Sequence, residues 1–183
     1  MVKIKTILKE MGMINEQRKY EFGCAMLFLD FPELDTIHNL INPDDLYHED
    51  GEEYGLESEP HLTLLFGLHE GVSTDAVKSV LKDKTFSECK AHNISLFENE
   101  KYDVLKFDIE GDGLHKVNKE LRKLPYTSTF PNYHPHMTIA YMKPGTGNAI
   151  CEKLEGKEYW LPPKHAVYSK PDGTKDSISI KKE

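Results

Sequence analysis

The chain has 183 residues and a mass of 21.0 kDa; 38% of its residues are hydrophobic and 30% are charged. This size suits one domain, or two small lobes that share a core, and the composition excludes a disordered chain. The net charge of −8 disfavours a long contact with nucleic acid, because such a contact needs many Lys and Arg side chains to neutralise phosphates.

The first half of the chain is expected to combine two strands with two helices. Residues 1–20 are polar and are predicted to form an N-terminal arm or a short amphipathic helix. The elements that follow are a buried strand over 23–29, a short helix over 33–41, a strand over 61–66 that ends at Gly67, and a helix over 73–84 capped by Ser73. An acidic loop over 43–59 leads into the second strand, and such a charge run is usually solvated.

The second half has a similar order of elements. They are strands over 89–97 and 102–109, a helix over 114–124, a strand over 136–141, a helix over 148–154 and two or three terminal strands, with a hairpin turn at 171–174. In the strand over 102–109, Val104, Lys106 and Asp108 alternate with apolar residues and therefore share one face. The order predicts an α+β protein, with residues 21–183 forming a single domain.

Neither a membrane span nor a disulfide framework is expected. No apolar run reaches the length of a membrane-spanning helix, and the N-terminus lacks the apolar core of a signal peptide. The three cysteines, Cys24, Cys89 and Cys151, are widely spaced, and their odd number without a Cys-x-x-Cys pair argues against disulfides and a thiolate metal site. A reducing cytoplasm is therefore the expected location.

Two copies of a His-x-Thr-x motif are the most informative feature of the chain. Each follows a proline: Pro60-His61-Leu62-Thr63-Leu64 and Pro135-His136-Met137-Thr138-Ile139. Because side chains alternate along a strand, each copy places its histidine and threonine on one face and its apolar residues on the other. One copy alone would suit a partly buried structural histidine. Two copies, both opening apolar runs after proline, predict a paired site.

A pair of histidines supports the cleavage of a phosphodiester. Histidine titrates near neutral pH, so one neutral imidazole accepts a proton from the attacking oxygen, which belongs to water or a ribose hydroxyl. The other imidazole, protonated, gives a proton to the leaving oxygen. The hydroxyls of Thr63 and Thr138 would donate hydrogen bonds to the phosphate oxygens as negative charge develops.

Other candidate residues carry weaker signals. His134 lies two residues before His136 and would share its strand face, although a loop histidine is the plainer interpretation. A metal pair of His134 and His136 lacks a third ligand at a matching spacing, so no metal is expected. Tyr54, Tyr133 and Trp160 are candidates to stack on a nucleobase, with ordinary packing as the alternative for each.

On its two motifs the chain resembles the 2H phosphoesterase superfamily, which comprises the LigT-like and 2′-5′ RNA ligase-like proteins. The resemblance runs from about Gly23 to Ile180. It implies a bilobal fold of two pseudo-symmetric lobes, each with an antiparallel sheet and helices, and an active-site cleft between them. It also implies phosphoester chemistry without metal or cofactor, with acid and base roles for both motif histidines and phosphate-binding roles for both motif threonines.

A second resemblance concerns one branch of that superfamily. The stretch from Glu53 to His61, followed by Gly67-Leu68-His69-Glu70, resembles a phage-encoded branch. That branch includes the anti-CBASS nucleases, which cut cyclic di- and trinucleotide immune signals. Membership would place the protein in the cytoplasm of the host.

Three functions stay open on the sequence. The first is a metal-independent phosphodiesterase, a monomer or weak oligomer, that hydrolyses a small nucleotide such as a cyclic oligonucleotide messenger. The second is a 2′,3′-cyclic phosphodiesterase or RNA-end-processing protein. It predicts a basic groove, whereas the lysine excess is confined to residues 143–183, with eight lysines against six acids. The third is a module that binds a nucleotide without cleaving it.

Overall fold

The computed structural model describes residues 20–50, 52, 54–127 and 130–183. Apart from Tyr20, the arm expected over residues 1–20 lies outside them. The helices are α2 (Leu34–His38), α3 (Thr74–Leu81), α4 (Leu114–Leu121) and α5 (Asn148–Leu154), with a 3-10 turn at Pro43–Asp45. The strands are β1 (Gly23–Leu29), β2 (His61–Leu68), β3 (Thr85–Phe86), β4 (Cys89–Phe97), β5 (Asp103–Glu110), β6 (His136–Met142), β7 (Tyr159–Leu161), β8 (Pro163–Ser169), β9 (Lys175–Ile178) and β10 (Lys181–Lys182).

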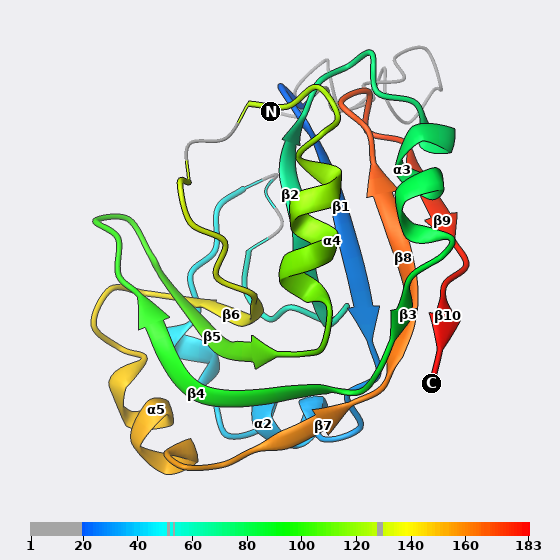
Figure 1. Cartoon of the computed structure of the whole chain (residues 1–183). Helices are drawn as coiled ribbons and strands as arrows, with labels where there is room; N and C mark the ends of the chain where they lie inside the picture. Colours follow the sequence, from blue (N-terminus) through cyan, green and yellow to red (C-terminus); the bar gives the residue numbers. More distant parts are fainter. Residues whose placement is uncertain (1–19, 51, 53, 128–129) are drawn as a thin grey trace, which may run out of the picture.

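Eight of the described strands form one curved sheet in the order β7-β4-β5-β6-β2-β1-β8-β9, and β10 pairs with β3 beside it (Figure 1). The prediction of an α+β fold is confirmed. The expected separate sheet in each half is replaced by one continuous sheet, because the motif strands β2 and β6 pair antiparallel at Leu62 and Met137. The division into two lobes around a cleft stays a prediction.

Strand β2 continues past the glycine that was expected to end it. Gly67 has a φ of +102°, a conformation that glycine adopts at little cost, and its carbonyl accepts a hydrogen bond from the Thr127 amide at 2.8 Å. The helix after it begins as predicted, since the Ser73 side chain accepts from the Ala76 amide at 3.2 Å.

The two halves of the sheet repeat the same backbone contacts. The amide of Leu29 donates to Pro60 at 2.9 Å, and the amide of Ile109 donates to Pro135 at 2.9 Å. In each half the motif strand also contains a bulge directly after the threonine, at Leu64 and at Ile139, where the register with the neighbouring strand shifts. The motif strands therefore have equivalent backbone pairing.

The helices that follow β1 and β5 cross over to the opposite half. Asn118 of α4 donates to the bulge carbonyl of Leu64 at 2.6 Å, and Figure 1 shows α4 lying over β2. Equivalently, Nε2 of His38 in α2 lies 3.1 Å from the bulge carbonyl of Ile139. Each bulge is thus held by a polar side chain from the other half, on the core face of the sheet.

Truncating the buried Asn118 should destabilise the protein. Asn118→Ala leaves the Leu64 carbonyl without this donor, and a buried group left unsatisfied costs roughly 1–3 kcal/mol. Urea unfolding measures the loss, with Lys119→Ala at the next, exposed helix position as the control. Equal midpoints for the two variants would contradict the role given to Asn118.

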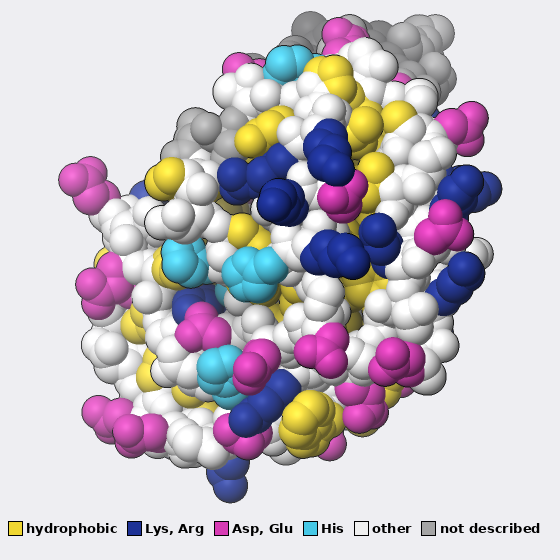
Figure 2. All heavy atoms as spheres, viewed as in Figure 1, with side chains coloured by type: hydrophobic (Ala, Val, Ile, Leu, Met, Phe, Trp, Pro, Cys, Tyr) yellow, Lys and Arg dark blue, Asp and Glu magenta, His cyan; other side chains and the backbone are white. Residues whose placement is uncertain are grey.

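Charge is distributed unevenly on the side of the molecule that carries α4. Figure 2 shows Lys and Arg side chains gathered over this helix and Asp and Glu side chains more frequent below it. The exposed Lys116, Lys119 and Lys123 belong to this helix or follow it directly.

No helix in the described part of the chain has the length and apolar character of a membrane span.

Candidate active site

The two motifs meet in the middle of the sheet. Leu62 and Met137, which pair across β2 and β6, are fully buried on the core face. One residue to each side of this pair, the antiparallel alternation sets His61 opposite Thr138 and Thr63 opposite His136. Such cross-strand neighbours lie about 5 Å apart between Cβ atoms. The four partly buried side chains form a compact group, here named the His–Thr square, as the motif spacing predicts.

Both histidines are oriented by backbone carbonyls. Nδ1 of His61 lies 2.7 Å from the carbonyl oxygen of Glu59, and Nδ1 of His136 lies 2.9 Å from that of His134. A carbonyl oxygen only accepts hydrogen bonds, so in each ring Nδ1 donates the proton. In the neutral form Nε2 then carries the free lone pair. Both rings therefore have Nε2 ready to accept or, when protonated, to donate a proton.

The surroundings of His61 are aromatic and apolar. Phe28 lies opposite His61 on β1, and their rings stack with centroids 5.3 Å apart. His165 stacks on the Phe28 ring at 5.2 Å and completes a row of three stacked rings. Met26 lies opposite Thr63, and the Cys24 sulfur is 3.9 Å from the Thr63 hydroxyl. The imidazole of His61 is therefore held by stacking on the Phe28 ring.

The surroundings of His136 are charged. At the positions equivalent to Phe28 and Met26, strand β5 places Asp108 opposite His136 and Lys106 opposite Thr138. The Lys106 ammonium forms an ion pair with Asp108 and lies over the Phe97 ring, 4.8 Å from its centroid. Phe97 also packs edge-on against His136, with centroids 4.9 Å apart. The two halves thus share a backbone plan but differ in chemistry.

Burial lowers the pKa of His136 below its usual 6.5, and the nearby Lys106 charge acts in the same direction, partly offset by the carbonyl of His134 and by Asp108. Burial alone would raise the pKa of Asp108, but hydrogen bonds from Lys106 and Asn93 outweigh it and the pKa is lowered. His136 is therefore mostly neutral and Asp108 ionised near neutral pH.

The other candidates from the sequence occupy different places. His134 contributes its backbone carbonyl to the orientation of His136. Tyr133 is turned inward, where its hydroxyl donates to the Thr63 carbonyl at 3.0 Å, so it supports β2 and does not offer a stacking face. Tyr54 packs against other tyrosines beyond the end of the motif on β6. Trp160 is 61% exposed on β7, near the sheet edge and beyond β4 and β5 from His136.

Three neighbours of the square were not singled out from the sequence: Phe28, Lys106 and Asp108. The alternation of β5 had put Lys106 and Asp108 on one face, but only the pairing of β5 with β6 places that face beside the motif. For Phe28 the signal was hidden, because it lies in an apolar run whose two faces look alike.

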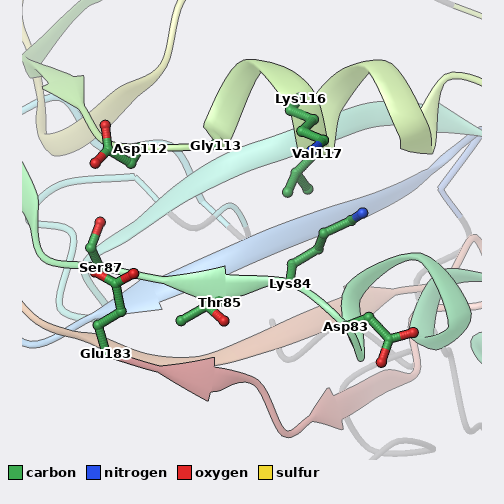
Figure 3. A pocket seen from close by; sticks show the side chains of 9 residues that line it. All are labelled: Asp83, Lys84, Thr85, Ser87, Asp112, Gly113, Lys116, Val117 and Glu183. Atoms are coloured by element: carbon green, nitrogen blue, oxygen red, sulfur yellow. The ribbon is translucent and has the colours of Figure 1, made fainter.

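A separate hollow of about 290 Å³ lies away from the square (Figure 3). Lys84, Lys116 and three acidic residues line it, between β3, the start of α4 and the C-terminal residue. It contains none of the motif residues. Within the described part of the chain, no three His, Cys, Asp or Glu side chains gather as a metal site would require.

Solved structures of similar shape define the fold class. Usb1 from Kluyveromyces marxianus matches with a TM-score of 0.55 at 8% identity, over 88% of this chain and 99% of that one. The same protein with uridine monophosphate matches with a TM-score of 0.51 at 9% identity, over 87% and 98%. E. coli LigT complexed with phosphate gives 0.45 at 17% identity, over 88% and 96%.

The family follows from the sequence match. The model of the 2′-5′ RNA ligase superfamily matches residues 46–169, which include both motifs. The chain belongs to this superfamily, and its resemblance to the 2H phosphoesterases is confirmed. No curated protein matches the chain.

Proposed function

We propose that the protein is a metal-independent phosphodiesterase that cleaves a small nucleotide by two-histidine acid–base catalysis. The observation that carries the proposal is the His–Thr square, in which both imidazoles have Nδ1 on a carbonyl and Nε2 free. Two such nitrogens supply both proton transfers that cleavage needs. The flanking hydroxyls of Thr63 and Thr138 supply hydrogen bonds to the phosphate oxygens.

The unequal surroundings of the two histidines support different roles for them in this mechanism. His136 has a lowered pKa and is the general base: its Nε2 takes the proton of the attacking water or ribose hydroxyl. The attacking oxygen bonds to phosphorus, and the bond to the leaving oxygen breaks. His61, protonated at Nε2, gives its proton to that leaving oxygen. Its ring is held for this by the stack on Phe28.

A small substrate is favoured over a long polynucleotide by the charges around the site. Lys106 is paired with Asp108 and Lys90 contacts Glu158 at 2.6 Å; Lys164 and Lys170 likewise pair with Asp30 and Asp176. Few positive charges are then available to follow a phosphate backbone. The superposed Usb1 structure contains uridine monophosphate, which agrees with a nucleotide ligand on this fold. Within this class, the branch resemblance favours cyclic di- and trinucleotide signals, as a phage anti-CBASS enzyme in the host cytoplasm would cut.

A substrate panel in EDTA tests the proposal. It contains 2′,3′-cyclic mononucleotides, cyclic di- and trinucleotides, 2′-5′ oligoadenylate and short RNA, with products identified by mass spectrometry. We expect cleavage of a small nucleotide that EDTA does not abolish. Preferential trimming of RNA ends would instead support an RNA-end-processing protein, the function that the description of the superfamily favours. Retention of a ligand without turnover would support a binding module.

The role of His136 predicts a particular pH dependence. Because the base must be neutral, kcat/KM should fall as the pH drops through the pKa of His136, which lies below 6.5. Lys106→Met introduces the residue type found at the equivalent Met26 and removes a positive charge, so that pKa should rise and the acidic limb should move to higher pH. A pH–rate profile measures this shift. If the acidic limb stayed in place or moved to lower pH, Lys106 would not be a cause of the lowered pKa of His136.

A further inference from the structure

Each motif strand carries one more side chain on the face of the His–Thr square. It is aromatic in both strands and stands three residues after the threonine: Phe66 in β2 and Tyr141 in β6. The bulges shift the alternation by one residue, which returns these side chains to the site face. Phe66 pairs with Cys24, whose sulfur lies beside the Thr63 hydroxyl, and this contact establishes the shared face.

Both side chains belong to aromatic groups. Phe66 is 47% exposed and packs edge-on against Phe22 at 6.1 Å; Phe22 also lies 6.1 Å from the ring of His69. These three residues are the Phe66 group. Tyr141 packs against Tyr54 at 5.1 Å and Tyr102 at 5.6 Å, and Tyr47 lies 5.0 Å from Tyr54. These four tyrosines are the Tyr141 group.

The two groups lie at opposite ends of the square. β2 and β6 run antiparallel, so the same step along each strand leads away from the motif in opposite directions. Because each bulge adds one unpaired residue, the step from the threonine to the aromatic residue covers only two paired positions, which places each group about 7 Å beyond its threonine. The phosphate-binding threonines lie between them.

We infer that the Phe66 group and the Tyr141 group each bind one nucleobase, so that the substrate is a phosphodiester with a base on both sides. The inference rests on the proposed function, because the phosphate is placed at the His–Thr square. Bases stacked in a helical strand are about 3.4 Å apart and cannot reach both groups. The bound nucleotide is therefore unstacked, with each base splayed onto a separate aromatic platform.

The platforms differ in what they offer a base. The Phe66 group offers an exposed phenyl face and an imidazole, which suits stacking on any base. The Tyr141 group adds phenol hydroxyls: that of Tyr47 donates to Glu49 at 3.0 Å, and the others can donate to and accept from a base edge. Base preference should therefore be stronger for the nucleoside at the Tyr141 group. A mononucleotide fills only one of the two platforms.

Binding to the His136→Ala variant tests this inference separately from catalysis. Calorimetric titration compares a dinucleoside monophosphate with the two mononucleotides derived from it. We expect the dinucleoside to bind at least about 10-fold more tightly, and Phe66→Ala and Tyr54→Ala each to remove roughly 5-fold or more of its affinity. Phe66→Trp keeps a stacking face and should retain affinity, whereas the matched control Phe66→Leu keeps apolar bulk and should not.

The outcomes separate the two proposals. Equal affinity for dinucleoside and mononucleotides, or variants within twofold of the parent, overturns the two-base inference. If the wild type nevertheless cleaves 2′,3′-cyclic mononucleotides, the proposed phosphodiesterase function is supported and only the two-base inference fails. Tight dinucleoside binding that depends on Phe66 and Tyr54, with no turnover by the wild type on any substrate, supports the inference and overturns the proposed function.

Discussion

His136→Ala should lower kcat roughly 10²–10⁴-fold, because it removes the general base while the hydroxyls and aromatic platforms remain. His61→Ala should cause a loss of similar size through the missing acid. The double variant should be little worse than either single one, since the two groups act in the same transition state. Turnover of the best substrate from the panel, measured with unfolding midpoints, checks the three values.

A histidine outside the site provides the control. His115 lies exposed on α4 and packs edge-on against Tyr133, away from the motif faces. His115→Ala should retain wild-type kcat within about twofold. If His61→Ala or His136→Ala also kept the parent kcat with an unchanged unfolding midpoint, the acid–base mechanism would be wrong.

Gly67→Ala should be among the most destabilising single substitutions in the chain. A Cβ at this position would lie 1.8 Å from the backbone oxygen of Thr127, and the φ of +102° is unfavourable for any other residue. Because the clash is with backbone and no side chain can move aside, we expect the free energy of unfolding to fall by roughly 3 kcal/mol or more. Thermal unfolding measures it, and for a chain of this length it corresponds to a shift of roughly 10 °C.

Gly71 is the matched control for this substitution. It follows the same strand, and a Cβ there meets nothing within 4 Å. Gly71→Ala should leave the unfolding midpoint nearly unchanged. If the two alanine variants melted together, the close approach between Gly67 and Thr127 would not hold the end of β2 as described.

Most helices and strands could be predicted because their signals are local. The apolar run of β1, the cap at Ser73 and the alternation of β5 each act within one element, and α5 has the bounds expected from the sequence. Gly67 was misread as a strand end because glycine marks both ends and bulged continuations, and only the contact with Thr127 decides between them. The short β3, β7 and β10 were not predicted separately, since two or three residues carry too little pattern.

The motif residues could be predicted, but their neighbours could not. Two copies of His-x-Thr identify themselves by repetition, whereas Asp108 and Lys106 gain meaning only from the register of β5 against β6. Tyr133 shows the opposite case: its residue type suited base stacking, yet its hydroxyl is engaged with Thr63 from the core side. Side-chain chemistry is readable from sequence, but the face on which a loop residue ends depends on tertiary packing.

The crossing of α2 and α4 has a consequence for how the chain acquires its structure. The Leu64 carbonyl is hydrogen-bonded by Asn118, which lies 54 positions later in the chain. The Ile139 carbonyl is contacted by His38, which lies 101 positions earlier. A fragment containing only the first motif would lack the helix that covers its own strand, and a fragment containing the second would lack His38. We therefore expect neither half to fold on its own. The two halves are interlocked, and translation must pass β6 before either histidine acquires its final surroundings.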